Sequence, residues 1–389
     1  MSASLLFCIY DNLQYLGKLK KAEKREKALL AANQEVKQLG EQTKLNNLET
    51  EQHNDMQGSK YSISLAIPGS FLNNAQNAEL RTYMAGQIAR AATLFCVEDI
   101  IIYDDTCKMT NEHVNAYWSG KWMGETAPSD SNFRHVNAYW SGKWMGETAP
   151  SDSNFEACFY LARILEYLEC PQYLRKYLFP IQKPLRFAGI LHPLDAQHHL
   201  RSDDLSIPFR EGIILNKPVK DGRGLLCDIG LDKANDRIPL PAGTRVTVEV
   251  NNFGTDSKRY RGKLSSARKV YEQCGKYWGY TVKLATSLRD AINRRNFDLI
   301  IGTSSRGEPV SSIFIDTMNY SRILLIFGSI SGVDAAVEAD ETLAESCAEE
   351  AFDFLVNPLP QKGTESERVE ESVLITLAEI TLRLQQLSS

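Results

Sequence analysis

DLIIGTSSRG, residues 298–307, is the stretch that decides the fold, because an aliphatic segment continues directly into a loop of Gly, Ser and Thr. Two later segments have the same design: residues 323–332 read ILLIFGSISG, and residues 352–358 read FDFLVNP and continue to Lys362-Gly363-Thr364. Near-continuous aliphatic runs are typical of parallel strands that are buried on both faces. Because ligands of open α/β sheets bind outside the carboxyl ends of such strands, we expect these three ends to converge on one small molecule.

An earlier part of the chain predicts a strand, a helix and a second strand. Residues 61–68 alternate aliphatic with smaller side chains, residues 75–97 have helical periodicity, and residues 98–103 are again mostly aliphatic. This order is a βαβ unit, which places two parallel strands in one sheet. The chain is therefore predicted to be an α/β protein with a parallel sheet.

The loops after the three C-terminal strands do not match a phosphate-binding signature. Residues 302–307 lack the G-x-G-x-x-G order, and G-x-x-x-x-G-K-[ST] does not occur in the chain. Small residues at these positions would let backbone groups approach a ligand closely, although a glycine after a strand can equally make a tight turn.

The three segments resemble the cofactor-binding end of the SPOUT RNA methyltransferases, whose chain is threaded into a trefoil knot around S-adenosylmethionine. The similarity covers about residues 61–384 and is greatest to the archaeal and eukaryotic subfamily with an inserted OB-like barrel. This subfamily includes the animal 28S rRNA uridine-N3 methyltransferases associated with the spindle and kinetochore. The resemblance implies a knotted SPOUT domain, S-adenosylmethionine as cofactor, rRNA as partner, and a homodimer packed through a closing helix at residues 372–384.

The resemblance also implies roles for particular residues near the three strand ends. The chain departs from the family pattern at Ser329, at Asp334 and at residues 361–362. The residues expected to bind the cofactor are Gly302, Thr303, Ser304, Gly328, Gly332, Asn357, Gly363 and Thr364.

Methyl transfer to uridine N3, which the resemblance implies, requires that this nitrogen lose its proton. Arg90 lies in a segment that resembles the helix carrying an active-site arginine in related ribose methyltransferases. Arg90 and Arg368 are candidates for orienting the base or stabilising its developing anion. Glu371 or Asp334 could accept the proton, but each is as readily explained as a charge at a helix start or a structural charge.

Between residues 209 and 284 the pattern changes to short strand-like segments separated by Gly and Pro, at residues 213–215, 225–229, 245–250, 260–264 and 280–284. Five short strands predict a small barrel of OB type, a fold that commonly binds single-stranded nucleic acid. The candidate RNA-binding residues are Lys258, Arg259, Arg261 and Lys263, which are interleaved with tyrosines. A solvated charged face is the alternative interpretation.

A second candidate RNA-binding segment contains His198, His199 and Arg201, where relatives have a Pro-His-His motif and this chain has Gln197. Adjacent histidines suggest a metal site, but no carboxylate or cysteine joins them at ligand spacing. We therefore expect no metal here, and we assign the three residues to RNA binding or to the wall of the active site. A purely structural role is the alternative.

One segment interrupts the resemblance. Residues 113–133 read HVNAYWSGKWMGETAPSDSNF, and residues 135–155 repeat this sequence without a change. Structural repeats diverge with time, and a solenoid needs at least three units. The copy is therefore interpreted as a recent duplication or as a duplicated exon in the gene model, without a function of its own. Ser153 and Glu156 have the spacing of a capping box, which predicts a helix over residues 157–176.

Composition limits the remaining possibilities. The formal net charge of −5 excludes a globally basic nucleic-acid binder, so RNA contacts must come from local patches. Eight scattered cysteines without a C-x-x-C pair are typical of a reducing compartment. We expect no signal peptide and no membrane span, because residues 5–10 are too short for a signal-peptide core and no apolar segment approaches membrane-spanning length. We expect a soluble, intracellular protein, located in the nucleus or nucleolus or at the spindle and kinetochore.

The predicted domains are a basic helical extension (residues 1–58), the first part of a SPOUT domain (59–208, with the duplicated segment 113–155), the OB-like barrel (209–278) and the knotted cofactor-binding part (279–389). The leading functional prediction is methylation of uridine N3 in 28S rRNA. The alternatives are a methyltransferase of the same fold that acts on another RNA or another atom, and a non-catalytic RNA-binding or spindle-associated scaffold.

Overall fold

The computed structural model describes residues 61–119, 155–179, 182–202, 204–215, 226–231, 234–235, 243–250, 260–292, 295–313, 320–343 and 351–388. The predicted N-terminal extension and most of the duplicated segment lie outside these residues. Within them, no helix is long and apolar enough to cross a bilayer.

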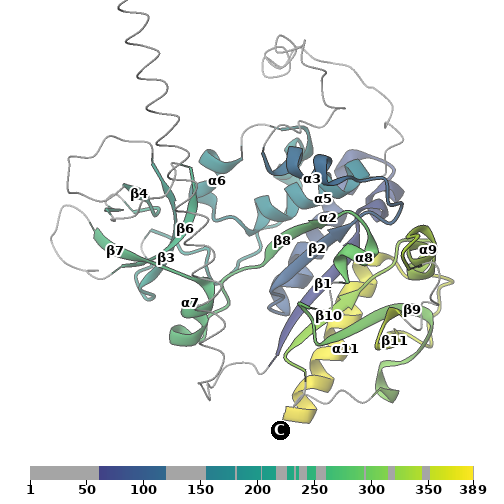
Figure 1. Cartoon of the computed structure of the whole chain (residues 1–389). Helices are drawn as coiled ribbons and strands as arrows, with labels where there is room; N and C mark the ends of the chain where they lie inside the picture. The colour runs from purple at the N-terminus through teal and green to yellow at the C-terminus, as the bar shows by residue number, and fades with distance from the viewer. Residues whose placement is uncertain are drawn as a thin grey trace, which may run out of the picture. The chain divides into compact units, whose positions relative to one another are not determined.

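A six-stranded parallel sheet is the larger of the two sheets in the described residues (Figure 1). Its strands are β1 (Ser62–Pro68), β2 (Asp99–Tyr103), β8 (Thr281–Ala285), β9 (Leu299–Pro309), β10 (Arg322–Ile326) and β11 (Phe354–Asn357). They are arranged in the order β11-β9-β10-β1-β2-β8, and every neighbouring pair is parallel. The prediction of a parallel α/β sheet from aliphatic runs is therefore confirmed.

Helices cover both faces of this sheet. On one face, Ile63, Leu65 and Ile67 of β1 pack in a cluster with α2 (Ala78–Leu94), α5 (Phe155–Glu169) and α11 (Val369–Ser388). On the other face, Ala66 lies in a cluster with α8 (Leu288–Ala291) and α9 (Gly332–Ala339). Successive side chains of a strand point to opposite faces, so β1 contributes to both clusters. Helix α2 begins where the Asn77 side chain accepts a hydrogen bond from the Leu80 backbone N–H at 2.7 Å.

Short helices complete the parallel-sheet part of the chain. The 3-10 helix η2 (Gly69–Asn74) follows β1 and contacts α5. A Cβ atom on Gly69 would lie only 2.5 Å from the Cα of Cys158, so glycine allows η2 and α5 to pack closely. The remaining 3-10 helices are η3 (Lys183–Leu185), η4 (Ala188–Ile190) and η5 (Val310–Ser312).

A second sheet of five strands is inserted between β2 and β8. It contains β3 (Phe209–Ile214), β4 (Cys227–Asp228), β5 (Ala234–Asn235), β6 (Arg245–Val250) and β7 (Tyr260–Ser265), in the order β4-β3-β6-β7-β5. Helix α7 (Ala267–Cys274) follows β7. One strand was assigned to the wrong sheet: residues 280–284 were expected in the barrel, but β8 pairs with β2 in the parallel sheet. Strand type can be read from local alternation, whereas the pairing partner depends on residues far away in the chain.

The predicted helix over residues 157–176 is also corrected, because the structure has two helices there. Helix α5 ends at Glu169 and α6 (Gln172–Leu178) begins directly after Pro171. Proline lacks the backbone N–H that a continuous helix needs, and its ring collides with the preceding turn. Periodicity continued across the break because Leu168 and Leu174 are both buried.

The described structure uses one end of each copy of the duplicated segment. Helix α3 (Asn111–Trp118) contains the start of the first copy, and α5 begins at Phe155, the last residue of the second copy. The His113 ring stacks on Phe155 with centroids 4.7 Å apart, and Tyr117 stacks on Phe159 at 5.2 Å. The Tyr117 hydroxyl also donates a hydrogen bond to Glu166 at 2.7 Å. A single copy of the segment contains the His and Tyr at its start and the Phe at its end, so one copy could supply all three of these side chains.

Deletion of residues 113–134 should therefore preserve the fold and leave thermal stability unchanged or slightly raised. The deletion joins Glu112 to the second copy, so that His135 and Tyr139 take the places of His113 and Tyr117. Shortening the connection lowers the loop-closure cost by an amount on the order of 1 kcal/mol. Thermal unfolding followed by circular dichroism measures the change. A marked loss of stability would mean that the two copies have different structural roles.

Candidate active site

Three loops meet at one edge of the parallel sheet, where β9, β10 and β11 end. Because β9 lies between β11 and β10 and all three strands are parallel, their carboxyl ends share this edge. Opposite β11, the pairing passes from Gly302 directly to Glu308, so residues 303–307 protrude from the ladder as a bulge. The Asn357 side-chain amide donates to the Ser305 carbonyl at 2.9 Å, which ties the ends of β11 and β9 together. The predicted convergence of the three segments is therefore present.

Glycine is required at this edge for different structural reasons at different positions. A Cβ atom on Gly302 would lie 2.7 Å from the Phe352 ring, and a Cβ on Gly328 would overlap the Val333 backbone nitrogen. Gly332 has a φ of +83°, which is costly for other residues. Close packing and backbone conformation thus explain these three without a ligand. A Cβ on Gly363 would meet nothing within 4 Å, and Gly363 and Thr364 are exposed beside open space.

Other predicted residues at this edge already have partners. The Thr303 hydroxyl is buried and donates to the Ile326 carbonyl at 3.0 Å. Asp334 forms an ion pair with Arg306 at 2.5 Å. The Glu371 carboxylate accepts a hydrogen bond from the Arg368 backbone N–H at 3.1 Å, as expected at the start of α11. Both candidate proton acceptors are therefore engaged in structural contacts.

Sequence reasoning missed a carboxylate at the same edge. Asp105 is the second residue after β2, and its Oδ2 accepts a hydrogen bond from the Ser70 hydroxyl at 2.6 Å. Its Oδ1 is buried and has no hydrogen-bond partner among the described residues. An unpaired buried carboxylate oxygen is costly unless a ligand or a proton satisfies it. The signal in the sequence was an acidic pair, Asp104-Asp105, immediately after an aliphatic strand at the ligand-binding edge.

Arg90 lies at the opposite edge of the sheet from these loops. Helix α2 returns the chain from the end of β1 to the start of β2, and Arg90 is near the end of that helix. Its guanidinium Nη1 donates to the Leu194 carbonyl at 2.5 Å. Within one chain, the structure does not bring Arg90 to the loops after β9, β10 and β11.

Arg90 instead lines a cavity of about 1280 Å³ between α2, the start of α6, the segment 191–202 and Gly230 of the second sheet. His199 and Arg201 line the same cavity, so one catalytic candidate and two RNA-binding candidates meet here. The other polar side chains of the lining are Tyr83, Gln87, Gln172, Tyr173, His192, Asp195 and Ser202. A cavity with guanidinium, imidazole, phenol and amide groups can hold a nucleotide by charge, stacking and hydrogen bonds.

Comparison with known proteins identifies the family. Residues 62–380 match a family model described as "Putative RNA methyltransferase". The chain belongs to this RNA methyltransferase family. A Caenorhabditis elegans protein named "Putative methyltransferase spot-1" is 50% identical over 85% of this chain and 82% of its own length. Proteins named "28S rRNA (uridine-N(3))-methyltransferase" are 40% identical in Mus musculus, over 86% of this chain and 79% of theirs, and 39% identical in Homo sapiens, over 82% and 78%.

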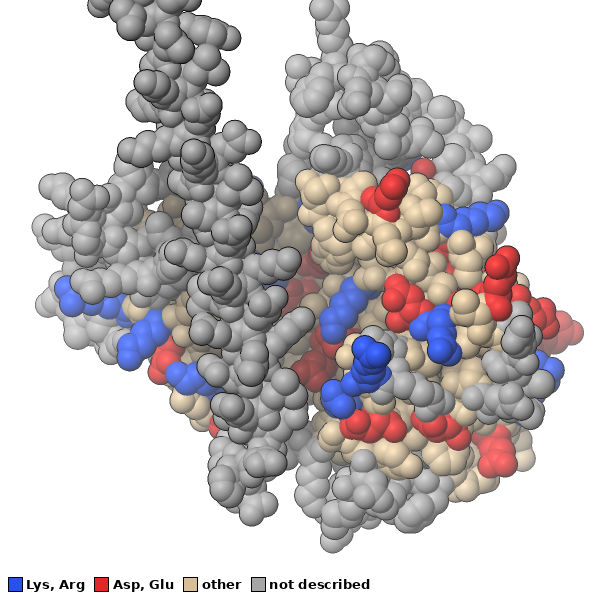
Figure 2. All heavy atoms as spheres, in the orientation of Figure 1, with Lys and Arg blue, Asp and Glu red and all other residues tan. Residues whose placement is uncertain are grey.

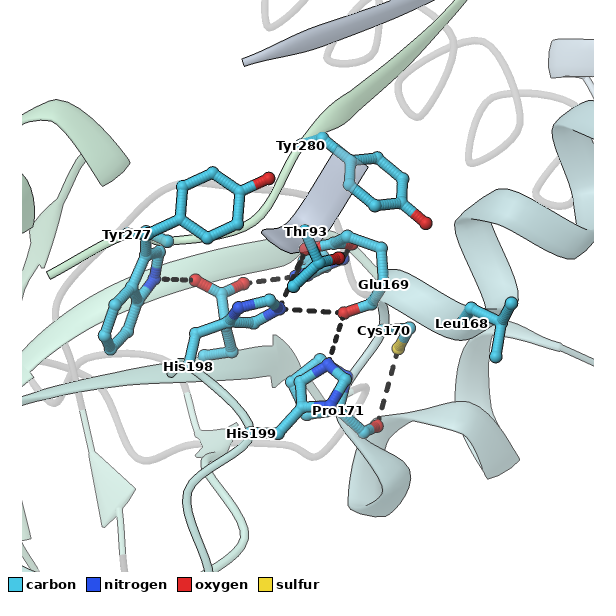
Figure 3. A network of polar contacts seen from close by, with 12 residues as sticks. Thr93, Leu168, Glu169, Cys170, Pro171, His198, His199, Tyr277 and Tyr280 are labelled. Atoms are coloured by element: carbon cyan, nitrogen blue, oxygen red, sulfur yellow. Dashed lines mark hydrogen bonds and ion pairs between the residues drawn. The ribbon is translucent and has the colours of Figure 1, made fainter. Parts of the chain in front are cut away.

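In this methyltransferase the rings of His198 and His199 lie against Glu169 (Figure 3). The Nε2 atoms of both rings lie within hydrogen-bond distance of the Glu169 backbone carbonyl, at 2.8 and 2.7 Å. The His198 side chain is buried and also contacts the Glu169 carboxylate at 3.0 Å. His199 lines the cavity as well, so its RNA-binding role stays a prediction, while the geometry of His198 supports a structural role. No group of three or more possible metal ligands was found among the described residues.

Glu169, the last residue of α5, connects this helix to the second sheet of the methyltransferase. Its carboxylate accepts hydrogen bonds from Arg245 of β6 at 2.5 and 2.9 Å, and Arg245 also binds Glu211 of β3 at 2.7 Å. Burial raises the pKa of Glu169, but Arg245 and His198 outweigh burial and lower it to about 2. Burial, together with the neighbouring His198, lowers the pKa of His199 to about 4. At neutral pH the network therefore contains an ionised Glu169 and a neutral His199.

The basic residues of the second sheet are only partly described. Arg261 and Lys263 lie on β7 and are exposed, whereas Lys258 and Arg259 lie outside the described residues. Lys263 stands opposite Glu249 in the ladder, and Glu249 pairs with Lys269 of α7 at 2.6 Å. In the view of Figure 2, basic and acidic side chains are interspersed on the described surface. RNA binding by these residues stays a prediction.

Proposed function

We propose that this methyltransferase transfers a methyl group from S-adenosylmethionine to N3 of a uridine in 28S rRNA. The observation that carries the proposal is the 39–40% identity, over more than four fifths of the chain, to proteins named for this activity. The convergence of the loops after β9, β10 and β11 supports a small-molecule site at the expected edge of the sheet.

The residues at this edge fit a methyl donor with polar and apolar parts. The exposed loop at Gly363 and Thr364 and the bulge at residues 303–307 would supply backbone amides and carbonyls. Ile330, which is 73% exposed in the loop after β10, would supply apolar contact. The cofactor supplies an activated methyl group, and the protein's contribution is orientation and exclusion of water.

The proposed fold is a SPOUT domain with a trefoil knot and an OB-like insertion. The strand order supports the knot, because β11 lies at the far side of β9 while α11 returns to pack against α2. The five-stranded second sheet between β2 and β8 supports the OB-like insertion.

The proposed active form is a homodimer that packs through α11. Helix α11 exposes Leu374 and Leu382, at 44% and 58%, and Glu371 on the same side, while its other face is buried in the core. The position of Arg90 at the edge opposite the loops also supports a dimer, because a partner subunit could bring its own loops to the cavity around Arg90.

Modification of rRNA further suggests the nucleus or nucleolus; association with the spindle and kinetochore remains a separate prediction.

The deciding experiment is mass spectrometry of rRNA nucleosides from cells that lack the protein, with and without re-expression. Loss and recovery of N3-methyluridine are expected. Loss of a different methylated nucleoside would indicate the same fold acting on another atom. Calorimetry with S-adenosylmethionine tests the scaffold alternative: micromolar binding supports the enzyme, and no binding by folded protein supports the scaffold.

RNA binding by the basic residues of β7 can be tested by substitution. The double substitution Arg261→Gln and Lys263→Gln should weaken binding to an rRNA fragment and lower the slope of log K against log salt by about 0.7 per charge removed. Lys283→Gln is the control, because Lys283 is a half-exposed cation on β8, where it pairs with Asp99 at 2.7 Å. Affinity is measured by fluorescence anisotropy at several salt concentrations. An unchanged slope would remove β7 from the interface.

A further inference from the structure

Asp105 lies where three neighbouring strands of the parallel sheet end. The strands β10, β1 and β2 are adjacent, and Ser329, Ser70 and Asp105 lie two or three residues beyond their respective carboxyl ends. Ser70 donates its hydroxyl hydrogen to Asp105 at 2.6 Å, and the Ser329 hydroxyl also acts on this carboxyl group. Ser329 belongs to the loop Gly328–Gly332, which is one of the three loops proposed to bind the cofactor. The Asp105 carboxylate therefore borders the proposed methyl-donor site.

The two adjacent aspartates have different roles. Asp104 is fully buried, and its two oxygens accept four hydrogen bonds from the Thr106 backbone and hydroxyl and from the backbones of Lys108 and Met109, at 2.7 to 3.0 Å. These bonds fix the turn after β2. Asp105 holds no part of the turn in this way, and its Oδ1 has no partner among the described residues. A buried carboxylate oxygen that has no hydrogen-bond partner at a ligand-binding edge is available to accept a hydrogen bond or a proton from a substrate.

The surroundings of Asp105 increase its basicity. Burial raises the pKa of its carboxyl group, and the neighbouring Asp104 charge raises it further, while the Ser70 and Ser329 hydroxyls lower it in part. The other titratable groups that face it are Tyr103, Cys107 and Cys158, whose pKa values are themselves raised, so they are neutral at pH 7. A general base works best when its pKa approaches the working pH. By contrast, Asp334 is paired with Arg306, and Glu371 caps α11.

We propose that Asp105 is a catalytic residue that accepts the N3 proton of the target uridine. The inference rests on the proposed uridine-N3 methylation. Oδ1 takes the proton from N3, and the nitrogen lone pair forms a bond to the methyl carbon of the sulfonium donor. The carbon–sulfur bond breaks, and its electron pair remains on sulfur as a neutral thioether. The proton then leaves Asp105 for solvent.

The test compares Asp105→Asn with the wild type on two rRNA transcripts, one with uridine and one made with 5-fluorouridine. The amide keeps the shape of the side chain but cannot accept the proton. Methylation of uridine by the variant should slow by about 100- to 1000-fold, as expected for the loss of a general base. Fluorine lowers the pKa of N3, so the 5-fluorouridine transcript should recover most of the rate. The rate of the variant on uridine should also rise with pH.

Asp104→Asn is the matched control, because it removes the neighbouring charge from the same turn. Any loss of rate in Asp104→Asn should be smaller than in Asp105→Asn and should come with a loss of stability, because Asp104 holds the turn after β2 and only its charge acts on Asp105. A wild-type rate for Asp105→Asn, or equal defects on both transcripts, would overturn the proposal. Failure of the wild type to methylate uridine N3 would instead refute the proposed function, so the two failures are distinguishable.

Two measurements without turnover complete the test. Calorimetric affinity for S-adenosylhomocysteine should change by no more than severalfold in Asp105→Asn; a large loss would make Asp105 a cofactor ligand and overturn its role as base. Because folding raises the pKa of Asp105, the ionised group opposes folding above that pKa. Relative to the wild type, Asp105→Asn should therefore gain stability as the pH rises from 3 to 7, and a loss over this range would contradict the proposal.

Discussion

Arg90→Ala should lower the rate of methyl transfer by about 100- to 1000-fold, a loss typical of removing one group that stabilises transition-state charge. Affinity for S-adenosylmethionine should stay within severalfold, because Arg90 lies at the sheet edge opposite the proposed cofactor loops. Thermal unfolding should change little, since the variant loses a single hydrogen bond to the Leu194 carbonyl. Single-turnover kinetics and calorimetry measure the two quantities, and wild-type turnover would exclude Arg90 from the mechanism.

Mixed dimers test whether Arg90 acts across a subunit interface. Gly328→Ala should displace the loop Gly328–Gly332 and thereby weaken cofactor binding, because a Cβ there overlaps the Val333 backbone. When this variant is mixed with Arg90→Ala, half of the dimers combine both chains and hold one complete site of two, so about one quarter of the wild-type activity should return. Arg90→Lys keeps the positive charge but loses the planar guanidinium group. This variant should have less activity than the mixed dimers, because lysine cannot make a bidentate contact. No recovery on mixing would place Arg90 and the loops of the same chain in one site.

Glu169→Ala should destabilise the fold by about 3 to 5 kcal/mol, as is usual when one partner of a buried ion pair is removed. The substitution leaves Arg245 with only Glu211 and deprives His198 of its carboxylate contact. Because Glu169 is the last residue of α5 and Arg245 lies on β6, the second sheet should also lose a fixed connection to α5. Chemical denaturation measures the free energy of unfolding. Glu272→Ala is the control, since Glu272 pairs with an Arg268 side chain that is 86% exposed, and no measurable loss is expected there.

The pH dependence of stability provides an independent check. Folding lowers the pKa of Glu169 from 4.5 to about 2, so its contribution is present above pH 4.5 and is lost as the pH falls toward 2. Folding lowers the pKa of His199 from 6.5 to about 4, so its contribution is present above pH 6.5 and is lost as the pH falls through 4. His199→Gln should flatten the stability profile between pH 6.5 and 4, and Glu169→Ala should flatten it below 4.5. Profiles parallel to the wild type would contradict these assignments.

The site could be predicted from sequence only where its residues follow aliphatic strands. The segments that end at Gly302, Gly328 and Asn357 were expected to converge, and they do, because adjacent parallel strands must end at one edge. Asp105 lies at the same edge, two residues after an aliphatic strand, but it was not among the predicted site residues. His198 was assigned to RNA binding or to the wall of the active site, with a structural role as the alternative, and its burial beside Glu169 depends on a contact between residues 29 positions apart in the chain.

The sequence by itself determined the parallel sheet, its βαβ opening and the presence of three aliphatic strands that continue into loops of small residues, because strand burial and helical periodicity leave local patterns. Only the tertiary structure decided that β8 pairs with β2, that Pro171 divides one predicted helix into two, and that Arg90 stands at the edge away from the loops. The physical reason is that the burial of individual residues in a strand or helix leaves a periodic pattern in the local sequence. Pairing and proximity instead depend on which distant segments lower the free energy by packing together.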